Sequence, residues 1–457
     1  MTAMTELEAL LGDAVSRDRD VLEGYRRDTA SWAPAGMPRA LVRPKSTEQV
    51  QVLARWATGH RVPIVPRGAG TGVAGGANAV DGCVVLSFER MNAIVELNEA
   101  AMYAVVQPGV LNVQLKDAAA DRGLWYAPDP SSFEISTLGG NVATNAGGLC
   151  CIKYGVTGDY VLGLEAVLAS GACLRTGGRC RKDVAGYDLT RLLVGSEGTL
   201  AILTELRLRL RRRPPPTSTF VALFGTLAAA GQATADVVRA AEPSLLEIMD
   251  RHALRAVEEY GRLGLDADAA AMLLGQVDTG NADEIAAVQR SCESAGAHLF
   301  YATDDPAEGQ LLLRARRLAY PALERLGSVI IDDISVPLPH LAEMLRRIGV
   351  VAAENEVLVA TVAHAGDGNI HPLIVFDPTH TDARARVHAV FERLMLEALE
   401  LGGTVTGEHG IGQIKAGFLH RQLDDTSLGI HRAIKQAFDP LNILNPGKVL
   451  TMPGARP

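Results

Sequence analysis

The sequence predicts an α+β protein made of two domains. Short apolar runs typical of strands alternate along the chain with amphipathic segments typical of helices. Three consecutive prolines, Pro214–Pro216, separate the two halves and mark the domain boundary. The length of 457 residues leaves room for a sizeable core, and a composition of 47% hydrophobic and 21% charged residues is typical of a folded protein.

The first half begins with a helical lead and continues as alternating helices and strands. Residues 1–37 contain Leu7, Leu10 and Leu11 and form the lead, and residues 38–213 form the first domain. Within this domain the local patterns predict one helix and three strands, at Thr47–Thr58, Val62–Val65, Cys83–Leu86 and Leu206–Leu210.

Arginines alternate with leucines in the last of these strands and continue to Arg213. Because this basic cluster precedes the three prolines, we interpret it as the solvated face of an edge strand followed by a linker. A docking patch for a partner is the alternative.

The second half favours an α+β substrate domain with an antiparallel sheet, open to a ferredoxin-like arrangement. Its predicted strands and helices are Phe220–Phe224, Leu227–Ala241, Ala270–Gln276 and Ala282–Ala295. We assign residues 214–425 to this domain and residues 426–457 to a C-terminal segment.

A glycine-rich loop follows the apolar run Val62–Val65. Its residues are Pro66, Arg67, Gly68, Ala69, Gly70, Thr71 and Gly72. A loop with so few side chains lets consecutive backbone N–H groups point at one anion, which suits a pyrophosphate. We therefore interpret it as a phosphate-binding loop, and a tight glycine turn without a ligand is the alternative.

Residues 70–75 also match the pattern G-x-G-x-x-G of dinucleotide-binding Rossmann folds. That pattern requires a helix to begin within it and an acidic residue about 20 positions later. Turn formers and the predicted strand Cys83–Leu86 follow instead. The sequence therefore predicts nucleotide binding without a Rossmann fold.

Two further segments are rich in small residues. One runs from Pro128 to Gly155, and the other spans Val194–Ile202. Small side chains leave space that something else must fill, and a planar ring system stacked on the backbone would fill it. We interpret the first of these segments as the bed of a flavin.

Metal-ligand residue types gather in the second half. His364 and His371 follow the apolar strand Val357–Val362, and Glu408 follows the strand-like piece Gly403–Thr406. Two imidazoles and a carboxylate are a common ligand set for zinc or a similar divalent ion. Two glycines between the histidines let the chain fold back so that both rings reach one point. Hydrogen-bonded residues at strand ends, without a metal, are the alternative.

Charge and composition exclude several classes of protein. The net charge of -9 disfavours a nucleic-acid-binding surface. The first residues lack the pattern of a signal or transit peptide, and no apolar run approaches the roughly 20 residues of a spanning helix. The six cysteines lack zinc or iron–sulfur spacing. We expect a cytoplasmic protein, with peripheral association at the inner face of a membrane left open.

At its three glycine segments the chain resembles the p-cresol methylhydroxylase and vanillyl-alcohol oxidase superfamily of FAD proteins. Within it, the chain is similar to the glycolate oxidase flavoprotein subunit and to the D-lactate and D-2-hydroxyglutarate dehydrogenases. The resemblance extends from Pro38 to Leu450. It implies the two-subdomain FAD-binding domain of that superfamily, followed by a substrate domain and a C-terminal segment that returns to the flavin.

The resemblance also implies which residues bind FAD. The loop from Pro66 to Gly72 would hold the pyrophosphate, and further contacts would come from Ser131, Gly139, Asn145, Gly148, Gly198, Ile202 and Asn445. Lys448 is an alternative to Asn445, and a simple Asn-Pro-Gly turn is a third interpretation of that segment. Members that bind FAD covalently often carry a histidine in the loop, and residues 66–77 contain none. We therefore expect non-covalent FAD.

Catalytic roles follow from the same resemblance. It places metal ligands, with zinc as the expected ion, at His364, His371 and Glu408, and it makes His409 the catalytic base. It also places Arg316 where the substrate carboxylate binds, a role that suits the bidentate guanidinium. A simple surface charge is the alternative for this arginine.

The expected reaction is oxidation of a D-2-hydroxy acid by hydride transfer to flavin N5, with assistance from the metal and the histidine. The D-2-hydroxyglutarate dehydrogenases bind a second carboxylate through a lysine and an asparagine, where this chain has Ile331 and Leu373. A dicarboxylate would leave one charge unpaired in apolar surroundings, which is costly. We therefore expect a small monocarboxylate such as glycolate or D-lactate.

Partners and other functions stay open. Electrons are expected to pass to an acceptor other than NAD, such as a quinone, a cytochrome, an electron-transfer flavoprotein or an iron–sulfur subunit. A homodimer or a hetero-complex would suit such a role. The alternative functions are a D-2-hydroxyglutarate-type dehydrogenase, an FAD subunit active only within a multi-subunit oxidase and, more remotely, a metallohydrolase.

Overall fold

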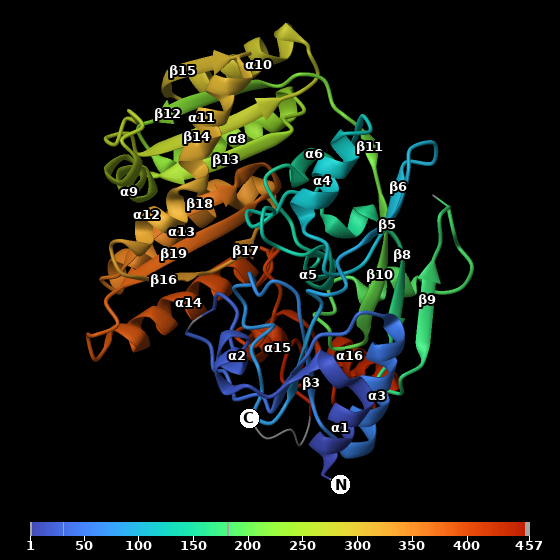
Figure 1. The fold of residues 1–457 in the computed structure, drawn as a ribbon. Helices are drawn as coiled ribbons and strands as arrows, with labels where there is room; N and C mark the ends of the chain where they lie inside the picture. Colours follow the sequence, from blue (N-terminus) through green and yellow to red (C-terminus); the bar gives the residue numbers. More distant parts are fainter. Residues whose placement is uncertain (1, 31, 181, 453–457) are drawn as a thin grey trace. The chain divides into compact units, whose positions relative to one another are not determined.

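The computed structural model describes residues 2–30, 32–180 and 182–452, which fold into two compact units (Figure 1). Unit 1 consists of Met1–Gly147, Val156–Arg213 and His409–Pro457, and unit 2 consists of Gly148–Gly155 and Pro214–Glu408. The longer part of unit 2 begins at the three prolines and ends at Glu408, earlier than the predicted boundary after residue 425.

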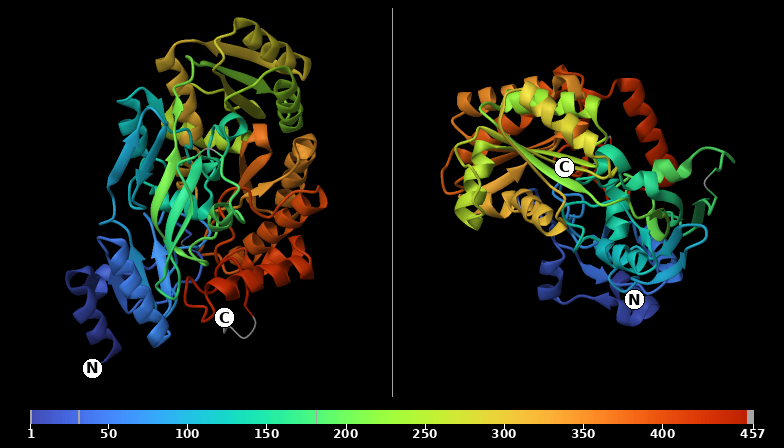
Figure 2. Two further views of the ribbon diagram at one scale, coloured as in Figure 1. Left: turned by 90° about the vertical axis from the view of Figure 1, so that its right-hand side faces the viewer. Right: turned by 90° about the horizontal axis from the view of Figure 1, so that it is seen from above.

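The first sheet of unit 1 carries the N-terminal helices. Its elements are α1 (Ala3–Leu11), β1 (Val15–Ser16), α2 (Arg19–Gly24), β2 (Ala40–Val42), α3 (Thr47–His60), β3 (Ile64–Arg67) and β4 (Val84–Ser87). The strand order is β1-β2-β4-β3, in which β2, β4 and β3 run parallel. Helices α1 and α3 lie side by side (Figures 1 and 2), and Leu7 of α1 is fully buried in the core that they share with the sheet. The N-terminal lead is therefore an integral part of unit 1.

The second sheet of unit 1 is antiparallel and corrects one prediction. Its strands are β5 (Ile94–Asn98), β6 (Tyr103–Val106), β8 (Val161–Val167), β9 (Cys173–Gly177) and β10 (Ile202–Arg209), in the order β5-β6-β10-β8-β9. The strand that carries Arg207 and Arg209 is thus central, and the prediction of an edge strand is wrong. β10 pairs with β6 along one edge and with β8 along the other. Its leucines are buried on one face of the sheet, and the arginines that alternate with them are half-buried on the other face.

Short elements complete unit 1. They are α4 (Asn112–Ala120), β7 (Leu124–Trp125), α5 (Leu138–Thr144), α7 (Leu189–Leu193), β11 (Arg211–Arg212), α15 (Leu419–Gln422) and α16 (Asp425–Phe438). Residues 68–83, all of them described, contain no helix. This confirms that the glycine loop does not open a Rossmann helix.

Unit 2 is built on one eight-stranded antiparallel sheet. Its strands are β12 (Ser218–Phe224), β13 (Leu245–Asp250), β14 (Ala271–Val277), β15 (Ala297–Thr303), β16 (Ser328–Ile331), β17 (Ile334–Ser335), β18 (Leu358–His364) and β19 (Asn369–Phe376). The order is β15-β12-β14-β13-β18-β19-β16, and β17 pairs with β19. The antiparallel sheet predicted for this half is confirmed.

Helices cover both faces of this sheet (Figures 1 and 2). They are α6 (Cys151–Tyr154), α8 (Leu227–Ala240), α9 (Arg251–Gly261), α10 (Ala282–Ser294), α11 (Pro306–Arg317), α12 (Ala319–Glu324), α13 (Leu341–Glu354) and α14 (Ala383–Glu400). Apolar residues of α9, α11 and α12 form one core cluster with the odd-numbered positions of β13 and β19 and the even-numbered positions of β18. Since side chains alternate along a strand, the same parity identifies which polar residues share this face.

Two local features bear on the site. The small segment Gly148–Gly155 is held in unit 2 by an ion pair of 2.6 Å between Lys153 Nζ and Asp278 Oδ1. The predicted strand at Gly403–Thr406 is absent among the described residues, and only an isolated bridge joins Thr404 to Ser335. Pairing at this segment stops after that single bridge, so the prediction of a strand is wrong.

Candidate active site

A tight hairpin brings His364 and His371 together in unit 2. His364 ends β18, and β19 begins five residues later, with Val362 directly opposite His371. Between them Gly368 has φ 79°, and a Cβ there would lie 2.1 Å from the Val336 carbonyl oxygen. Only glycine fits this turn. The two rings lie with their centroids 5.0 Å apart and their planes at 84°, on the face of the sheet that α11 covers.

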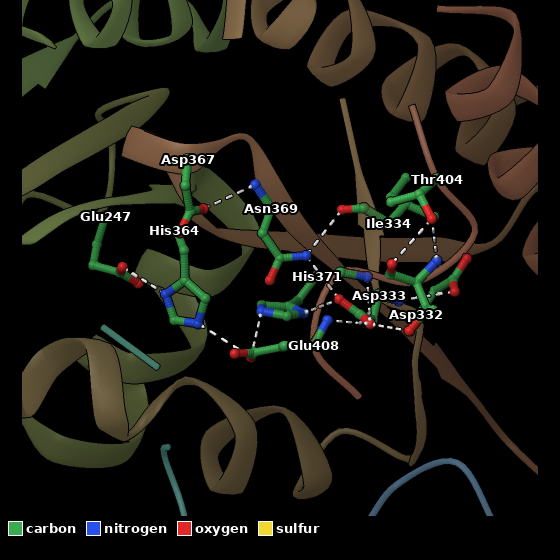
Figure 3. A network of polar contacts seen from close by, with 12 residues as sticks. Glu247, Asp332, Asp333, Ile334, His364, Asp367, Asn369, His371, Thr404 and Glu408 are labelled. Atoms are coloured by element: carbon green, nitrogen blue, oxygen red, sulfur yellow. Dashed lines mark hydrogen bonds and ion pairs between the residues drawn. The ribbon is translucent and has the colours of Figure 1, made fainter. Parts of the chain in front are cut away.

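Glu408 completes the group (Figure 3). Its Oε1 lies 3.3 Å from His364 Nε2 and 3.3 Å from His371 Nε2, and the ligand atoms of the three residues all lie within 4.8 Å of one another. His364 and His371 are buried, and Glu408 is half-buried. Two imidazole nitrogens and a carboxylate oxygen that already converge fit a zinc-like divalent ion.

The electrostatics of the group also suit a cation. Burial alone would disfavour a charged His364, but Glu247 and Glu408 outweigh this cost and raise the pKa of His364 well above its usual value. Burial likewise opposes ionisation of Glu408, yet His364 and His371 hold the pKa of this carboxyl well below its usual range. The group therefore concentrates carboxylate charge around two ligand nitrogens.

A fully buried carboxylate, Asp333, holds the loop that carries Glu408. Its Oδ2 accepts hydrogen bonds from Thr406 Oγ1 at 2.7 Å, Gly407 N at 2.9 Å and Glu408 N at 3.0 Å, while its Oδ1 accepts from Asn369 Nδ2 at 2.7 Å (Figure 3). Asp333 therefore anchors the backbone at Gly407 and Glu408, directly after the single bridge between Thr404 and Ser335. The sequence analysis missed Asp333, although an acidic pair between isoleucines was a signal.

A second buried carboxylate, Glu247, joins the group to Arg316. Glu247 lies on β13 directly opposite His364. Its Oε1 lies 2.6 Å from His364 Nδ1, and its Oε2 accepts from Arg316 Nε at 2.7 Å. Arg316, near the end of α11, is only 8% exposed. The alternative that it is a surface charge is therefore wrong, and Glu247 is a second residue that was not predicted from the sequence.

Ile331 and Leu373 are directly opposite each other in the register of β16 and β19. Leu373 stands two positions after His371, so it shares the face of the metal-ligand group. Leu373 is buried and Ile331 is half-buried against the same apolar cluster. Ile331 and Leu373 thus form one apolar cross-strand pair.

The three glycine segments converge in unit 1. A Cβ at Gly68 would lie 2.3 Å from Thr137 Oγ1, at the N-cap of the short helix α5, and a Cβ at Gly198 would lie 2.9 Å from Pro66. Gly139 is buried in the first turn of α5. The first segment therefore contacts both of the others through backbone that side chains would keep apart.

Two cationic side chains of unit 1, those of Arg67 and Lys448, are buried. Arg67 is 8% exposed, and its Nη1 is buried with no hydrogen-bond partner among the described residues. Lys448 is buried as well, and desolvation lowers its pKa to about 8 although Asp28 opposes the shift. An unpaired buried guanidinium N–H is costly unless an anion accepts it. The loop from Pro66 to Gly72 therefore fits a pyrophosphate.

The C-terminal segment ties these loops together. Asn445 donates through Nδ2 to the carbonyl oxygens of Gly76 and Glu197, both at 2.8 Å, and its backbone N–H bonds to Ile64 O at 2.8 Å. Asn145 forms the left-handed C-cap of α5, and its Oδ1 accepts from Gly158 N at 2.8 Å. These contacts of both asparagines are thus structural ones that shape the loops.

Glu197 is a further residue that the sequence analysis did not single out. Its carboxylate accepts from Ile411 N at 2.8 Å and from Gly412 N at 2.9 Å, just after His409 in the chain. Burial raises the pKa of Glu197 to about 7. Within unit 1, Glu197 therefore fixes the segment that begins with His409.

Three other residues predicted to bind FAD have different surroundings. Ile202 is fully buried in the apolar core around the first sheet, so its side chain has a packing role. Gly148 belongs to unit 2, and Ser131 is exposed. Among the described residues, no helix is both long and apolar enough to cross a membrane.

Comparisons with known proteins agree with this architecture. Residues 38–177 match the model of an FAD binding domain, and residues 213–449 match the model of the C-terminal domain of FAD linked oxidases. The glycolate oxidase subunit GlcD of Bacillus subtilis is 43% identical over 419 residues, which cover 90% of this chain and 89% of the relative. The D-lactate dehydrogenase of Archaeoglobus fulgidus is 36% identical over 435 residues, covering 94% and 96%.

Two solved structures share the fold. A 4-ethylphenol oxidase from Gulosibacter chungangensis superposes with a TM-score of 0.81 at 20% identity, over 99% of this chain and 97% of that one. A p-cresol methylhydroxylase does so with a TM-score of 0.81 at 20% identity, over 98% and 96%. The family models and the identities show that the chain belongs to the FAD-linked oxidases and is an FAD-linked oxidoreductase.

Proposed function

We propose that the chain oxidises a small D-2-hydroxy monocarboxylate, glycolate or D-lactate, to the 2-oxo acid by hydride transfer to flavin N5. The observation that carries the proposal is the buried group in unit 2, where Glu247 links an arginine to a convergent set of two histidines and a glutamate. The names of the curated relatives support oxidation of small hydroxy acids.

Arg316 would bind the substrate carboxylate. Its guanidinium is buried and already oriented through Nε, which leaves the Nη edge for a bidentate contact. A carboxylate held there would place the neighbouring hydroxyl carbon beside the face that carries His364 and His371. Binding therefore also orients the carbon that loses hydride.

His364, His371 and Glu408 would hold a divalent ion, with zinc as the expected one. The chemistry that such an ion would supply is Lewis acidity, which would favour loss of the substrate's hydroxyl proton. The chain contributes converging ligands, and Asp333 and Glu247 hold two of them in place.

His409 would accept the hydroxyl proton as general base. It follows Glu408 directly, so its Cα lies within about 3.8 Å of the Cα of a proposed ligand. Glu197 restrains residues 411 and 412 on the other side of it. The base is thus carried on a short stretch between two restrained positions.

The loop from Pro66 to Gly72 would hold FAD non-covalently, with Arg67 facing its pyrophosphate. The chemistry that FAD supplies is acceptance of two electrons as a hydride. We place the onward acceptor among a quinone, a cytochrome, an electron-transfer flavoprotein and an iron–sulfur subunit, and we propose a cytoplasmic enzyme that works alone or in a complex.

The apolar pair Ile331–Leu373 supports a monocarboxylate substrate. It lies on the face of the metal-ligand group, where the second carboxylate of 2-hydroxyglutarate would otherwise find polar partners. An unpaired carboxylate in such surroundings costs several kcal/mol. Glycolate and D-lactate carry only an apolar end at that position.

The test is anaerobic addition of glycolate, D-lactate, L-lactate and D-2-hydroxyglutarate while the flavin absorbance is followed. We expect bleaching by one of the two proposed monocarboxylates and loss of bleaching in His409→Ala. A yellow protein bleached by none of them would support a subunit that is active only within a complex. A colourless protein that does not take up FAD would favour the metallohydrolase and overturn the proposal.

A further inference from the structure

We propose that Glu247 is a positioning residue that couples the metal ligand His364 to the carboxylate-binding Arg316. The inference rests on the proposed function and adds to it a link between the two binding groups. Its basis is one fully buried side chain whose two oxygens serve two different partners.

The backbone fixes where this carboxylate lies. Glu247 and His364 are register partners on neighbouring antiparallel strands, so their side chains stand next to each other on one face (Figure 3). Arg316 reaches the same carboxylate from α11, which packs on that face. Strand pairing and helix packing thus meet at Glu247.

The contact to His364 selects its tautomer. A carboxylate oxygen accepts a hydrogen bond, so His364 Nδ1, at 2.6 Å from Oε1, is the donor. In the neutral ring the lone pair is then on Nε2, which is the nitrogen that faces Glu408. A metal ligand needs this tautomer, and a carboxylate behind a histidine is the usual way to obtain it.

The contact to Arg316 selects the edge that the guanidinium presents. Nε donates to Glu247 Oε2 at 2.7 Å, and this fixes the plane of the group. The Nη1 and Nη2 edge then remains for a bidentate carboxylate. Because one carboxylate holds both partners, any displacement of Glu247 disturbs metal binding and substrate binding together.

An amide in place of this carboxylate can satisfy only one partner. If the amide oxygen accepted from His364, the NH2 group would oppose the Nε–H of Arg316. If the oxygen accepted from Arg316, the NH2 group would donate to His364 Nδ1 and move the ring proton to Nε2. Glu247→Gln therefore breaks one of the two contacts directly, and the displaced side chain disturbs the other contact as well, without a change in side-chain size.

The experiment compares Glu247→Gln with a matched control, Glu397→Gln. Glu397, on α14 and outside the group, is also a buried carboxylate of unit 2, and it accepts from Arg347 on α13 and from Arg393 on α14. Affinity for Zn²⁺ and Mn²⁺ is measured on the FAD-loaded proteins by competition with a chromophoric chelator. Steady-state turnover of the active monocarboxylate with an artificial electron acceptor supplies KM and kcat separately.

We expect Glu247→Gln to bind metal about 10- to 100-fold more weakly and to raise KM by at least about tenfold, as loss of an outer ligand partner does. Glu397→Gln should lower thermal stability and leave metal affinity and KM within about twofold of the wild type. If Glu247→Gln does not fold, Glu247→Asp keeps the charge and lacks the reach to both partners, and we expect the same two losses from it.

Folded Glu247 variants with wild-type metal affinity and wild-type KM would overturn the inference while the proposed function stood. Failure of the proposed function gives a different result, because no acid would then reduce the wild-type flavin. The metal titration would still test the link between Glu247 and His364 in that case.

Discussion

Removal of Asp333 tests how far the geometry of the site depends on one buried carboxylate. Asp333→Ala deletes the acceptor of four hydrogen bonds, from Asn369, Thr406, Gly407 and Glu408. The side chain of Asp333 is fully buried, so the change also removes the cost of burying a charge. What remains is a set of donors without their partner and a loop without its anchor.

The expected loss of stability follows from where these donors lie. Asn369 is buried and loses a charge-assisted bond, whereas Gly407 is exposed and Glu408 half-buried, so water can replace part of their loss. Each orphaned donor costs about 1–3 kcal/mol, less where water reaches it. With the desolvation of the carboxylate recovered, we expect unit 2 to lose about 3–5 kcal/mol.

The assay must report on unit 2. The tryptophans Trp32, Trp56 and Trp125 all belong to unit 1, so tryptophan fluorescence follows the wrong unit. Hydrogen exchange measured by mass spectrometry gives peptide-level values, and we expect faster exchange at residues 404–408. Metal affinity, measured by chelator competition, should fall about 10- to 100-fold because the ligand Glu408 loses its support.

Asp250→Ala is the matched control. Asp250 is a buried carboxylate of the same sheet that accepts from Ala253 N at 2.9 Å and Thr361 N at 2.8 Å. The Asp250→Ala substitution should destabilise unit 2 and leave its metal affinity unchanged. Asp333→Ala protein that exchanges residues 404–408 at the wild-type rate, or that binds metal as tightly as the wild type, would refute the assigned role.

Three further predictions concern substrate, pH and cofactor. Ile331→Lys should raise kcat/KM for D-2-hydroxyglutarate relative to D-lactate at least about tenfold, by pairing the second carboxylate; an unchanged ratio would contradict the placement of the substrate. Burial raises the pKa of Glu197 from 4.5 to about 7, so between these pH values the folded protein keeps a proton on Glu197 that the unfolded chain releases. The free energy of unfolding should therefore decrease by up to about 3 kcal/mol as the pH rises from 4.5 to about 7. Glu197→Gln should remove that part of the slope in urea unfolding, and equal slopes would count against it. Arg67→Gln should weaken FAD binding about 10- to 100-fold in reconstitution of the apoprotein, and an unchanged dissociation constant would exclude the pyrophosphate contact.

Elements with strong local patterns could be predicted closely. The predicted helices at Thr47–Thr58 and Leu227–Ala241 are observed as α3 (Thr47–His60) and α8 (Leu227–Ala240). Periodicity and flanking turn residues are local properties, so sequence carries them. The predicted edge strand failed for the opposite reason, since the place of β10 in the sheet depends on its pairing with β6 and β8.

The ligand types, the glycine loops and the mid-chain linker could be predicted from sequence alone, because each is a short pattern with its own chemistry. The sequence also identified His364, His371, Glu408 and Arg316 as candidates. The position of Glu247, far from them along the chain, depends on the folded structure, where it lies opposite His364 and contacts Arg316. A buried carboxylate chooses its partners through strand register and helix packing, and no local pattern encodes either.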